Sequence, residues 1–482
     1  MLNIRPGDVK KKIQRPGQIA LYLALVAVAS TLRIEAARNS LWLDEIWSLD
    51  LASRLSSPLD IFYKIHSDNN HYLNALWLYF TGFQGDWPGY RIPSILAGIG
   101  SVVVAGLIAH RRNAASAFVA MLLTSFSYVL VLYASEARGY STLVFFSLFS
   151  YYWMDRYLET RRWRMALAFS LVASLGLLSH LTFVSFLFSS FLWAAFRLLD
   201  SHRGFKDVFV SLTLCYLIPM LLLVLLYLID IHFMVIVGGD QPGLFNCYMS
   251  SLAWALGMPP GFATWMTFGI AAVIFILEIC LLWQERPDLA VFFTSVVVIM
   301  PILLVLTGGS DVLYVRYFII SIAFFLILLS FLLASLCASW GNKGRVLCGL
   351  LLAGYLAANG GHLLALFKYG RGNNAEAIHF LLQNSNKSAV TVGGDQDFRI
   401  GTVLDFYSRT EIDGPRLKYF PAGSWPTNGV EWLICEKESY EDPVPPGKLL
   451  VDPLGRQYDL VRIFPTAPLS GLHWFIYHNR AD

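Results

Sequence analysis

The chain has 482 residues, of which 56% are hydrophobic and only 14% are charged, and its mean hydropathy is +0.55. These values exclude an ordinary water-soluble globular protein and indicate a polytopic membrane protein. The formal net charge of +3 does not point to a nucleic-acid partner, because basic residues in short loops between the apolar segments account for the excess.

Apolar runs long enough to cross a bilayer as helices recur over the first three quarters of the chain. The first run follows a basic tail and is long, which is typical of a retained membrane anchor and not of a cleaved signal peptide. Only Ser179 and His180 interrupt the stretch 165–199, so a tight turn must join its two helices. We expect about eleven spans, at residues 18–36, 91–109, 114–133, 139–155, 165–181, 182–199, 207–230, 263–283, 289–307, 315–338 and 345–367.

The orientation follows from the basic residues in alternate loops, which mark the cytoplasmic side of a membrane protein. On this basis the N-terminus is cytoplasmic, and an odd number of spans places residues 37–90 and everything after about residue 368 outside. The cytoplasmic set is Arg5, Lys10, Lys11, Lys12, Arg15, Arg111, Arg112, Arg156, Arg161, Arg162, Arg164, Arg197, Arg203, Lys206, Arg286, Lys343 and Arg345.

The segment 368–482 is more polar than the rest, and the glycine-rich run 370–374 marks a linker before it. Helical spacing over 375–382 and 400–407 alternates with strand-like runs at 389–392, 432–435, 458–464 and 474–477. This order predicts a small extracytoplasmic α/β domain, built as an open sandwich, beside a transmembrane domain at 1–367. The run Gly393-Gly394-Asp395 lacks the glycine spacing of a dinucleotide-binding loop, and we interpret it as a turn.

An acidic pair, Asp44-Glu45, follows the first predicted span. Two adjacent carboxylates at a membrane surface cost solvation energy when they are packed, which favours a functional use, although a solvated loop is the simpler alternative. The stretch 72–80 is apolar at helical spacing and predicts a helix lying in the membrane plane. The same outer segment adds Asp68, His71 and Arg91. Later loops predicted on the same outer face add Glu136, Arg138, Tyr140, His180 and Arg316.

Carboxylates suited to proton transfer, together with Arg and His suited to phosphate, indicate a site for an anionic lipid-linked substrate. Each residue also has a structural explanation. Arg138 is able to serve as a topological anchor at a helix end, Arg316 as part of an interfacial aromatic belt, and His180 as a helix-end polar residue.

Four motifs, taken in order, resemble the GT-C superfamily of polyprenyl-phosphate-sugar-dependent glycosyltransferases. The closest branch is the protein O-mannosyltransferase-like one that includes the lipid A aminoarabinose transferases, and the resemblance covers roughly residues 15–335. One departure is His71-Tyr72-Leu73, where many relatives have His-Pro-Pro. The motifs are Trp42-x-Asp-Glu45, Asp68-Asn-Asn-His-x-Leu-Asn74, Tyr90-Arg-Ile-Pro-Ser94 and Ser135-Glu-Ala-Arg-Gly-Tyr140.

This resemblance implies an all-α, many-helix enzyme of a bacterial inner membrane. Such an enzyme moves a hexosyl or pentosyl group from a polyprenyl-phosphate donor to a glycan, lipid or protein acceptor on the outer face. It implies that Asp44 acts as the base with Glu45 as its neighbour, and that Glu136 is the second acidic residue. We expect a single inverting displacement in which Arg138 and Arg316 stabilise the leaving phosphate, with His71 and His180 behind them.

No cofactor is predicted, although carboxylates beside a phosphate are able to hold a divalent cation. Three alternatives to a glycosyltransferase stay open. A secondary transporter is expected to carry polar residues at mid-membrane on broken helices. A lipid-linked glycan polymerase or ligase is expected to carry its Arg and His on one large late loop, and a non-catalytic scaffold would tolerate loss of Asp44.

Overall fold

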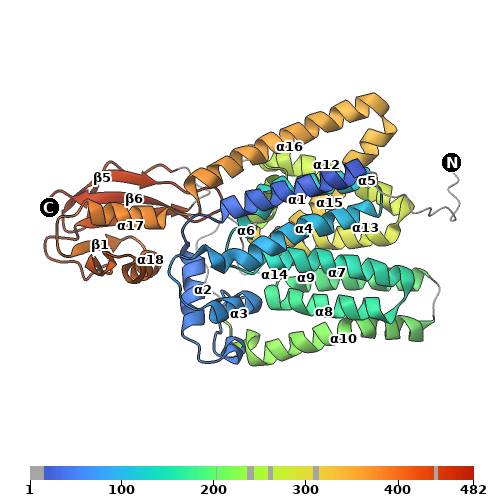
Figure 1. The fold of residues 1–482 in the computed structure, drawn as a ribbon, viewed down its shortest axis with the longest axis horizontal. Coiled ribbons are helices and arrows are strands. Elements are labelled where there is room, and N and C mark those ends of the chain that lie inside the picture. Colours follow the sequence, from blue (N-terminus) through green and yellow to red (C-terminus); the bar gives the residue numbers. More distant parts are fainter. Residues whose placement is uncertain are drawn as a thin grey trace.

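The computed structural model describes residues 16–201, 204–235, 244–258, 264–307, 314–438 and 443–481. Long helices lie roughly along one direction and form most of the molecule, and a smaller domain with a sheet lies at one end of them (Figure 1). The described part of the chain begins at the opposite end. Arg203 and the basic residues before Pro16, which the sequence analysis used to predict the orientation, lie outside the described residues.

A helix or a pair of helices is present at each of the eleven predicted spans, because each apolar run satisfies its own backbone hydrogen bonds as a helix. They are α1 (Pro16–Ala36), α4 (Ile92–His110), α5 (Ala114–Phe126) with α6 (Tyr128–Ala134), α7 (Tyr140–Thr160), α8 (Trp163–Ser179), α9 (Phe183–Asp200), α10 (Phe205–Ile229), α12 (Thr264–Glu285), α13 (Pro287–Thr294) with the π-helical turn Ser295–Ile299 and α14 (Met300–Thr307), α15 (Ile319–Ser339) and α16 (Gly341–Tyr369).

By length and composition, eight helices among the described residues are able to cross a membrane, or nine if α5 and α6 count as one bent span. The two predicted spans that do not qualify are α7 and α8. The first is rich in Ser and Tyr, and the second has only 17 residues. These two helices pack against each other, and α7 also packs against α4.

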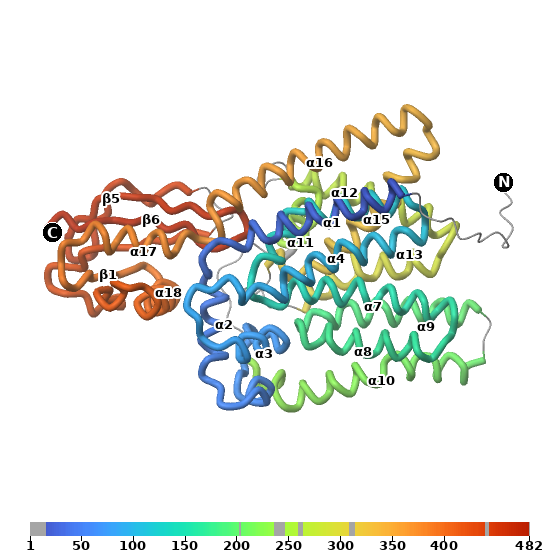
Figure 2. The backbone as a smooth tube through the Cα atoms, viewed as in Figure 1, coloured from blue at the N-terminus to red at the C-terminus, as the bar shows by residue number. Residues whose placement is uncertain are grey.

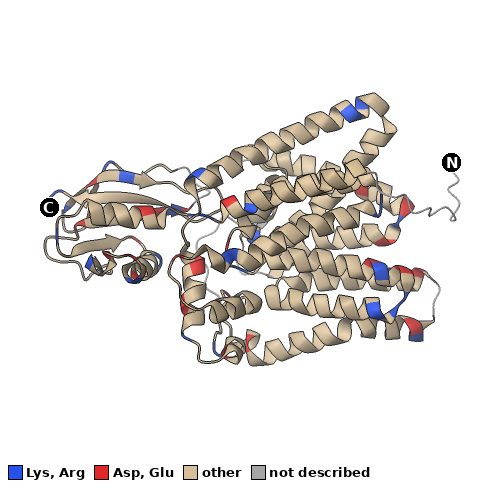
Figure 3. Cartoon of the chain, viewed as in Figure 1, with Lys and Arg blue, Asp and Glu red and all other residues tan. Residues whose placement is uncertain are grey.

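Charged side chains gather at the two ends of the helical bundle, and the long middle sections of the helices are almost free of them (Figure 3). This distribution fits an apolar slab between two aqueous faces. Together with the apolar helices it confirms a polytopic helical membrane protein.

Ser127 breaks the chain between α5 and α6, which meet at an angle of 59°. Its backbone is not helical (φ −56°, ψ 115°). The N–H of Tyr128, which the break leaves without an intrahelical acceptor, donates to the side chain of Asn359 at 2.8 Å. The break redirects α6, whose end leads directly into the loop that holds Glu136 and Arg138.

Shorter helices lie at the end of the bundle that faces the sheet domain (Figure 2). The predicted amphipathic helix is present as α3 (Tyr72–Thr81), and α11 (Leu244–Ala255) precedes α12. Four further segments are 3-10 helices: Pro58–Phe62, Pro88–Arg91, Ile231–Phe233 and Val315–Phe318.

The acidic pair lies in the first turn of a helix, α2 (Leu43–Ser53), and not in a loop. Acidic side chains are favourable there because the helix N-terminus carries a partial positive charge. Glu45 also reaches back to cap the helix, accepting a hydrogen bond from the N–H of Trp42 at 3.2 Å.

The C-terminal domain is an α/β domain, as predicted. Its sheet has the order β2-β1-β3-β6-β5-β4, with β1 parallel to β2 and β3 and the remaining neighbours antiparallel. Two strands of three residues each, β2 and β4, are too short to give a sequence pattern and were not predicted. The elements are α17 (Asn374–Gln383), β1 (Val390–Gly394), α18 (Asp397–Thr410), the 3-10 turn Gly414–Arg416, β2 (Leu417–Tyr419), β3 (Trp432–Glu438), β4 (Leu449–Val451), β5 (Gln457–Phe464) and β6 (Leu472–Asn479).

Both helices of this domain pack on the same face of its sheet, so the arrangement is an open sandwich. On that face Ile378 of α17 and Val403 of α18 meet Ile434 and Ile476 of adjacent strands in one apolar cluster. The same cluster continues into α2 through Ile46, Leu49 and Ala52. The C-terminal domain and the end of the bundle that carries α2 therefore share a core.

The segment 370–374 is not an exposed linker. The side chain of Arg371 is fully buried and lies over the ring of Trp42, with its guanidinium carbon 5.0 Å from the ring centroid. Asn374 donates to the carbonyl oxygen of Leu41 at 3.3 Å. Glycine-rich composition here reflects tight packing of the backbone and not flexibility, since a Cβ at Gly370 would lie 2.9 Å from the side chain of Asn39.

Candidate functional site

Asp44 lies where three segments meet: the start of α2, the loop between α6 and α7, and the 3-10 turn before α15. Its Oδ2 is 3.1 Å from Nη1 of Arg138 and 3.0 Å from Nη1 of Arg316. Arg138 also donates to the side chain of Asn69. The structure thus brings together the acidic residue and the two arginines that the sequence analysis assigned to one site.

The cluster of Asp44, Arg138 and Arg316 has an excess of positive charge, because two guanidinium groups share one carboxylate. Burial alone would raise the pKa of Asp44, but the fields of Arg138, Arg316 and Arg371 outweigh it and lower this pKa below 3.8. The carboxylate is therefore ionised at neutral pH. Only 3% of the Arg138 side chain and 16% of the Arg316 side chain are exposed, so an anion that reaches them meets little competing water.

Aromatic rings surround the two arginines. The guanidinium of Arg316 lies 4.3 Å from the ring centroid of Tyr314 and 5.8 Å from that of Tyr140, and Arg138 lies 5.6 Å from the ring of Tyr140. Cation–π contacts of this kind hold a guanidinium without using its N–H groups. The arginines are thus oriented while some of their donors stay available for a ligand.

Glu45 faces a different part of the molecule. Its carboxylate is fully buried and forms a bidentate pair with Arg91, with distances of 2.7 and 2.6 Å. It also accepts a hydrogen bond from the N–H of Ala137 at 2.6 Å. The remaining donors of Arg91 bind three backbone carbonyl oxygens, those of Ala37, Asn39 and Ser40.

All five N–H groups of Arg91 are therefore used inside the protein. The sequence analysis predicted Glu45 as a catalytic residue and Arg91 as a substrate-binding residue, and these roles stay predictions. The contacts of the pair join the start of α2 to the loop that carries Arg138.

His71 and His180 pack beside Tyr140, with ring centroids 4.7 to 5.1 Å apart. Gly139 donates its N–H to Nδ1 of His71 at 2.7 Å. Burial and the nearby arginines lower the pKa of His71 well below 6.5 and that of His180 to about 3. Both imidazoles are neutral at physiological pH, so they contribute shape and hydrogen bonds and no positive charge for a phosphate.

Glu136 is also fully buried, and its Oε2 lies 2.9 Å from Nη1 of Arg371. Burial raises the pKa of Glu136 to about 7, against the opposing effects of Arg371 and Arg138. Sequence analysis selected Glu136 but did not identify Arg371, whose segment had the composition of a linker.

Two cavities open beside Asp44. The first, defined here as the membrane-side cavity, is lined by Asp68, Asn69 and Arg138 together with Trp47 and Tyr317. The second, the domain-side cavity, also borders Asp44 and reaches the C-terminal domain. It is lined by Trp42, Leu43, Asp44, Tyr133, Tyr314, Val315, Arg316, Arg399, Glu438, Leu469, Ser470, Gly471 and Leu472.

The C-terminal domain thus contributes side chains that sequence analysis did not select. Arg399 lies in the first turns of α18, after β1, and Glu436 and Glu438 lie at the end of β3, which is parallel to β1. Ligands of α/β sheets bind at the carboxyl ends of parallel strands. Applied to the polar residues that follow the predicted strands, this rule would have identified Arg399, Glu436 and Glu438 from the sequence.

Among the residues that the structure describes, no three His, Cys, Asp or Glu side chains come close enough together to hold a metal ion. The carboxylates next to the arginines are engaged in ion pairs. A role for a divalent cation is therefore not supported by any group of ligands in the described ranges.

No protein-family model matches the chain. No curated protein sequence matches it either. The chain is similar in structure to ArnT from Cupriavidus metallidurans in two crystal structures, one bound to undecaprenyl phosphate and one in the apo state, with TM-scores of 0.53 and 0.54. In both comparisons the identity is 13%, and the match covers 95% of this chain and 98% of the ArnT chain. The chain is therefore similar in fold to these ArnT structures over nearly its whole length.

Proposed function

We propose that this protein is a membrane glycosyltransferase that transfers a sugar from a polyprenyl-phosphate donor to an acceptor at the outer face of the membrane. The observation that carries the proposal is the ionised Asp44 between Arg138 and Arg316, at the meeting point of two cavities. A further support is the shared fold, since the similar ArnT structure holds undecaprenyl phosphate.

In this proposal the donor phosphate binds Arg138 and Arg316, whose planar groups form charge-assisted hydrogen bonds with phosphate oxygens. The acceptor hydroxyl oxygen attacks the anomeric carbon and gives its proton to Asp44. The bond between that carbon and the phosphate oxygen breaks, and the electron pair leaves with the polyprenyl phosphate. The two arginines stabilise the charge that develops on this leaving group.

The same arginines lower the pKa of Asp44, so an incoming phosphate competes with the carboxylate for them. As the phosphate takes over their donors, Asp44 loses its stabilising partners and becomes a better proton acceptor. Binding of the donor and activation of the base are linked in this way. Glu45, Arg91, Glu136, His71 and His180 act in the proposal by positioning the segments that carry the cluster.

The proposal places the end of the bundle with Asp44 and the C-terminal domain outside the cytoplasm, in a bacterial inner membrane, with the N-terminus inside. In a variant without the six native cysteines, a cysteine at Leu454 should react with a membrane-impermeant thiol reagent in intact cells. A cysteine at Arg162, at the other end of the bundle, should react only after permeabilisation. Both positions are exposed, so access to reagent reports the side of the membrane. The reverse pattern would reject this orientation.

Replacing Arg138 by Lys should weaken use of the donor by about tenfold, because an ammonium group cannot hold two phosphate oxygens as the planar guanidinium does. Replacement by Ala should weaken it further. The measurement is the KM for a polyprenyl-phosphate sugar in purified protein, with Arg156→Lys, an exposed charge-preserving change at the opposite end, as the control. Full activity of Arg138→Lys would mean that Arg138 serves only as a charged anchor, and Arg316 would then be the main phosphate ligand.

The function itself is tested by mass analysis of surface glycans and lipid-linked sugars in a strain that lacks the protein. We expect a sugar to be missing from the surface glycan and its polyprenyl-phosphate form to accumulate on the membrane. Accumulation of an unmodified solute on one side would favour a transporter. A loss of chain length, without loss of a sugar type, would favour a polymerase or ligase.

A further inference from the structure

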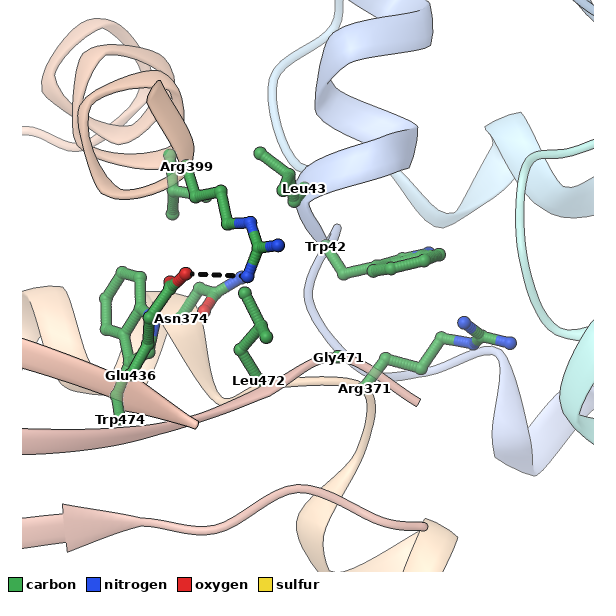
Figure 4. A pocket seen from close by; sticks show the side chains of 10 residues that line it. Trp42, Leu43, Arg371, Asn374, Arg399, Glu436, Gly471, Leu472 and Trp474 are labelled. Carbon is green, nitrogen blue, oxygen red and sulfur yellow. Dashed lines mark hydrogen bonds and ion pairs between the residues drawn. The ribbon is translucent and has the colours of Figure 1, made fainter. Parts of the chain in front are cut away.

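The space beside Asp44 extends into the C-terminal domain. A third cavity adjoins the domain-side cavity and shares with it Trp42, Leu43 and Arg399. It ends at Glu436 and Trp474 on the sheet of the C-terminal domain (Figure 4). Arg399 also lines the membrane-side cavity, so one side chain borders all three spaces.

Two carboxylates hold Arg399 at this border. Nη1 of Arg399 lies 3.0 Å from Oε1 of Glu436 and 3.3 Å from Oε1 of Glu438. The Glu436 side chain is only 3% exposed, and its Oε2 has no hydrogen-bond partner among the described residues. A buried carboxylate oxygen without a partner costs free energy. Oε2 of Glu436 is therefore a position at which a ligand is able to donate a hydrogen bond.

The opposite walls of the third cavity are partly apolar. Trp42 lines the cavity from the membrane domain with its indole ring turned toward Arg371, and Leu472 and Trp474 line it from the sheet (Figure 4). Aromatic rings supply a flat apolar contact, while the carboxylates and the guanidinium supply directed hydrogen bonds. A sugar ring has both kinds of surface, because its C–H groups form an apolar face and its hydroxyl groups lie around the edge.

The charges here differ from those around Asp44. Burial raises the pKa of Glu436 to about 8 and also raises the pKa of Glu438, so the cluster around Arg399 carries little net charge at neutral pH. Around Asp44, by contrast, Arg138 and Arg316 share one carboxylate and attract an anionic phosphate. The two clusters therefore suit different ligands, an uncharged hydroxyl-rich group at Arg399 and a phosphate at Asp44.

From these contacts we propose that the C-terminal domain holds a sugar unit of the acceptor, in a subsite formed by Trp42, Arg399, Glu436, Glu438 and Trp474. The inference rests on the proposed glycosyltransferase function and names the acceptor class as a neutral, hydroxyl-rich glycan. A hydroxyl of that sugar unit projects from the subsite toward Asp44 through the domain-side cavity.

The test uses the full-length protein and two variants, Glu436→Gln and Glu438→Gln, which keep side-chain size. The matched control is Glu376→Gln in the same domain, where Glu376 is exposed and paired with Arg462 outside the cavities. The acceptor is the glycan fraction extracted from a strain that lacks the protein. Its binding is measured by saturation-transfer difference NMR and its KM by transfer assays, while binding of undecaprenyl phosphate reports the donor side.

We expect each subsite variant to raise the acceptor KM and the dissociation constant of the glycan by about tenfold or more, because the amide of Gln removes a hydrogen bond that the carboxyl group makes with the sugar. Binding of undecaprenyl phosphate and the melting temperature should stay at wild-type values, and the control should match the wild type in every assay. Glu438→Gln serves as the second variant, since its partly exposed side chain makes a folding defect less of a concern than at Glu436.

Three results would overturn the inference. Unchanged glycan binding in both folded variants would remove the glycan from this subsite. Weaker binding of undecaprenyl phosphate with unchanged glycan binding would assign the subsite to the donor. Transfer of the sugar to a peptide, and not to the glycan, would show that the proposed acceptor class is wrong. Failure of the proposed glycosyltransferase function gives a different result, because the wild-type protein would then transfer no sugar at all. In that case the NMR measurement would still show whether the glycan binds at Glu436.

Discussion

Replacement of Asp44 by Asn is expected to lower turnover by roughly two to four orders of magnitude, because Asn has nearly the same shape but cannot accept the acceptor's proton. Binding of the donor should persist or become tighter. The carboxylate that competes with phosphate for Arg138 and Arg316 is removed in this variant, and the amide carries no negative charge. Rapid-quench measurement of sugar transfer, alongside binding of undecaprenyl phosphate, separates the two effects.

Asp50→Asn is the matched control, because Asp50 lies in the same helix but outside the cavities beside Asp44 and pairs with Arg54 at the surface. It should have wild-type turnover. Near-normal turnover of Asp44→Asn would end its assignment as the base. Loss of donor binding in that variant would show instead that the carboxylate is needed to hold the two arginines in place.

Replacement of Glu45 by Gln is expected to destabilise the folded protein by about 3–5 kcal/mol, since it leaves Arg91 as a buried charge without a counter-ion. The effect should appear as a lower melting temperature and a lower yield in the membrane. Glu35→Gln is the control, because Glu35 forms an exposed pair with Arg38 near the same end of the bundle, and its melting temperature should be unchanged.

Activity provides the decisive comparison for Glu45. If the residue only positions α2, then turnover of Glu45→Gln per folded molecule, measured well below its melting temperature, should stay within a few-fold of wild type. A variant with wild-type stability and greatly reduced turnover would instead place Glu45 in the chemistry, as its position beside Asp44 in the sequence suggested.

Much of the site was predictable, because the order of the apolar spans shows which of the connecting segments lie on the same side of the membrane. The segments that hold Asp44, Arg138 and Arg316 are far apart in sequence, yet each follows or precedes an apolar span that ends at the same side. Span order and loop position were enough to bring these three residues together. The α/β class of the C-terminal domain was also predictable, from the alternation of helical and strand-like runs.

Other parts of the site were not predictable, for geometric reasons. Adjacent residues on an α-helix point about 100° apart, so in α2 Asp44 meets Arg138 and Arg316 while Glu45 meets Arg91. When the segment is interpreted as a loop, the directions of the two side chains are not restricted in this way. Arg371 and Arg399 were missed because their roles depend on how the C-terminal domain docks against α2, and no local pattern records that contact.

The fully buried pair of Glu136 and Arg371 has a consequence for how such chains can be recombined. A cut or fusion near residue 368 would separate a buried cation from its anion and would also divide the apolar cluster that α2 shares with α18. The C-terminal domain is thus not a detachable module, although composition alone marks a boundary there. A chimaera that exchanges this domain should stay intact only if α2 and the loop bearing Glu136 are exchanged with it.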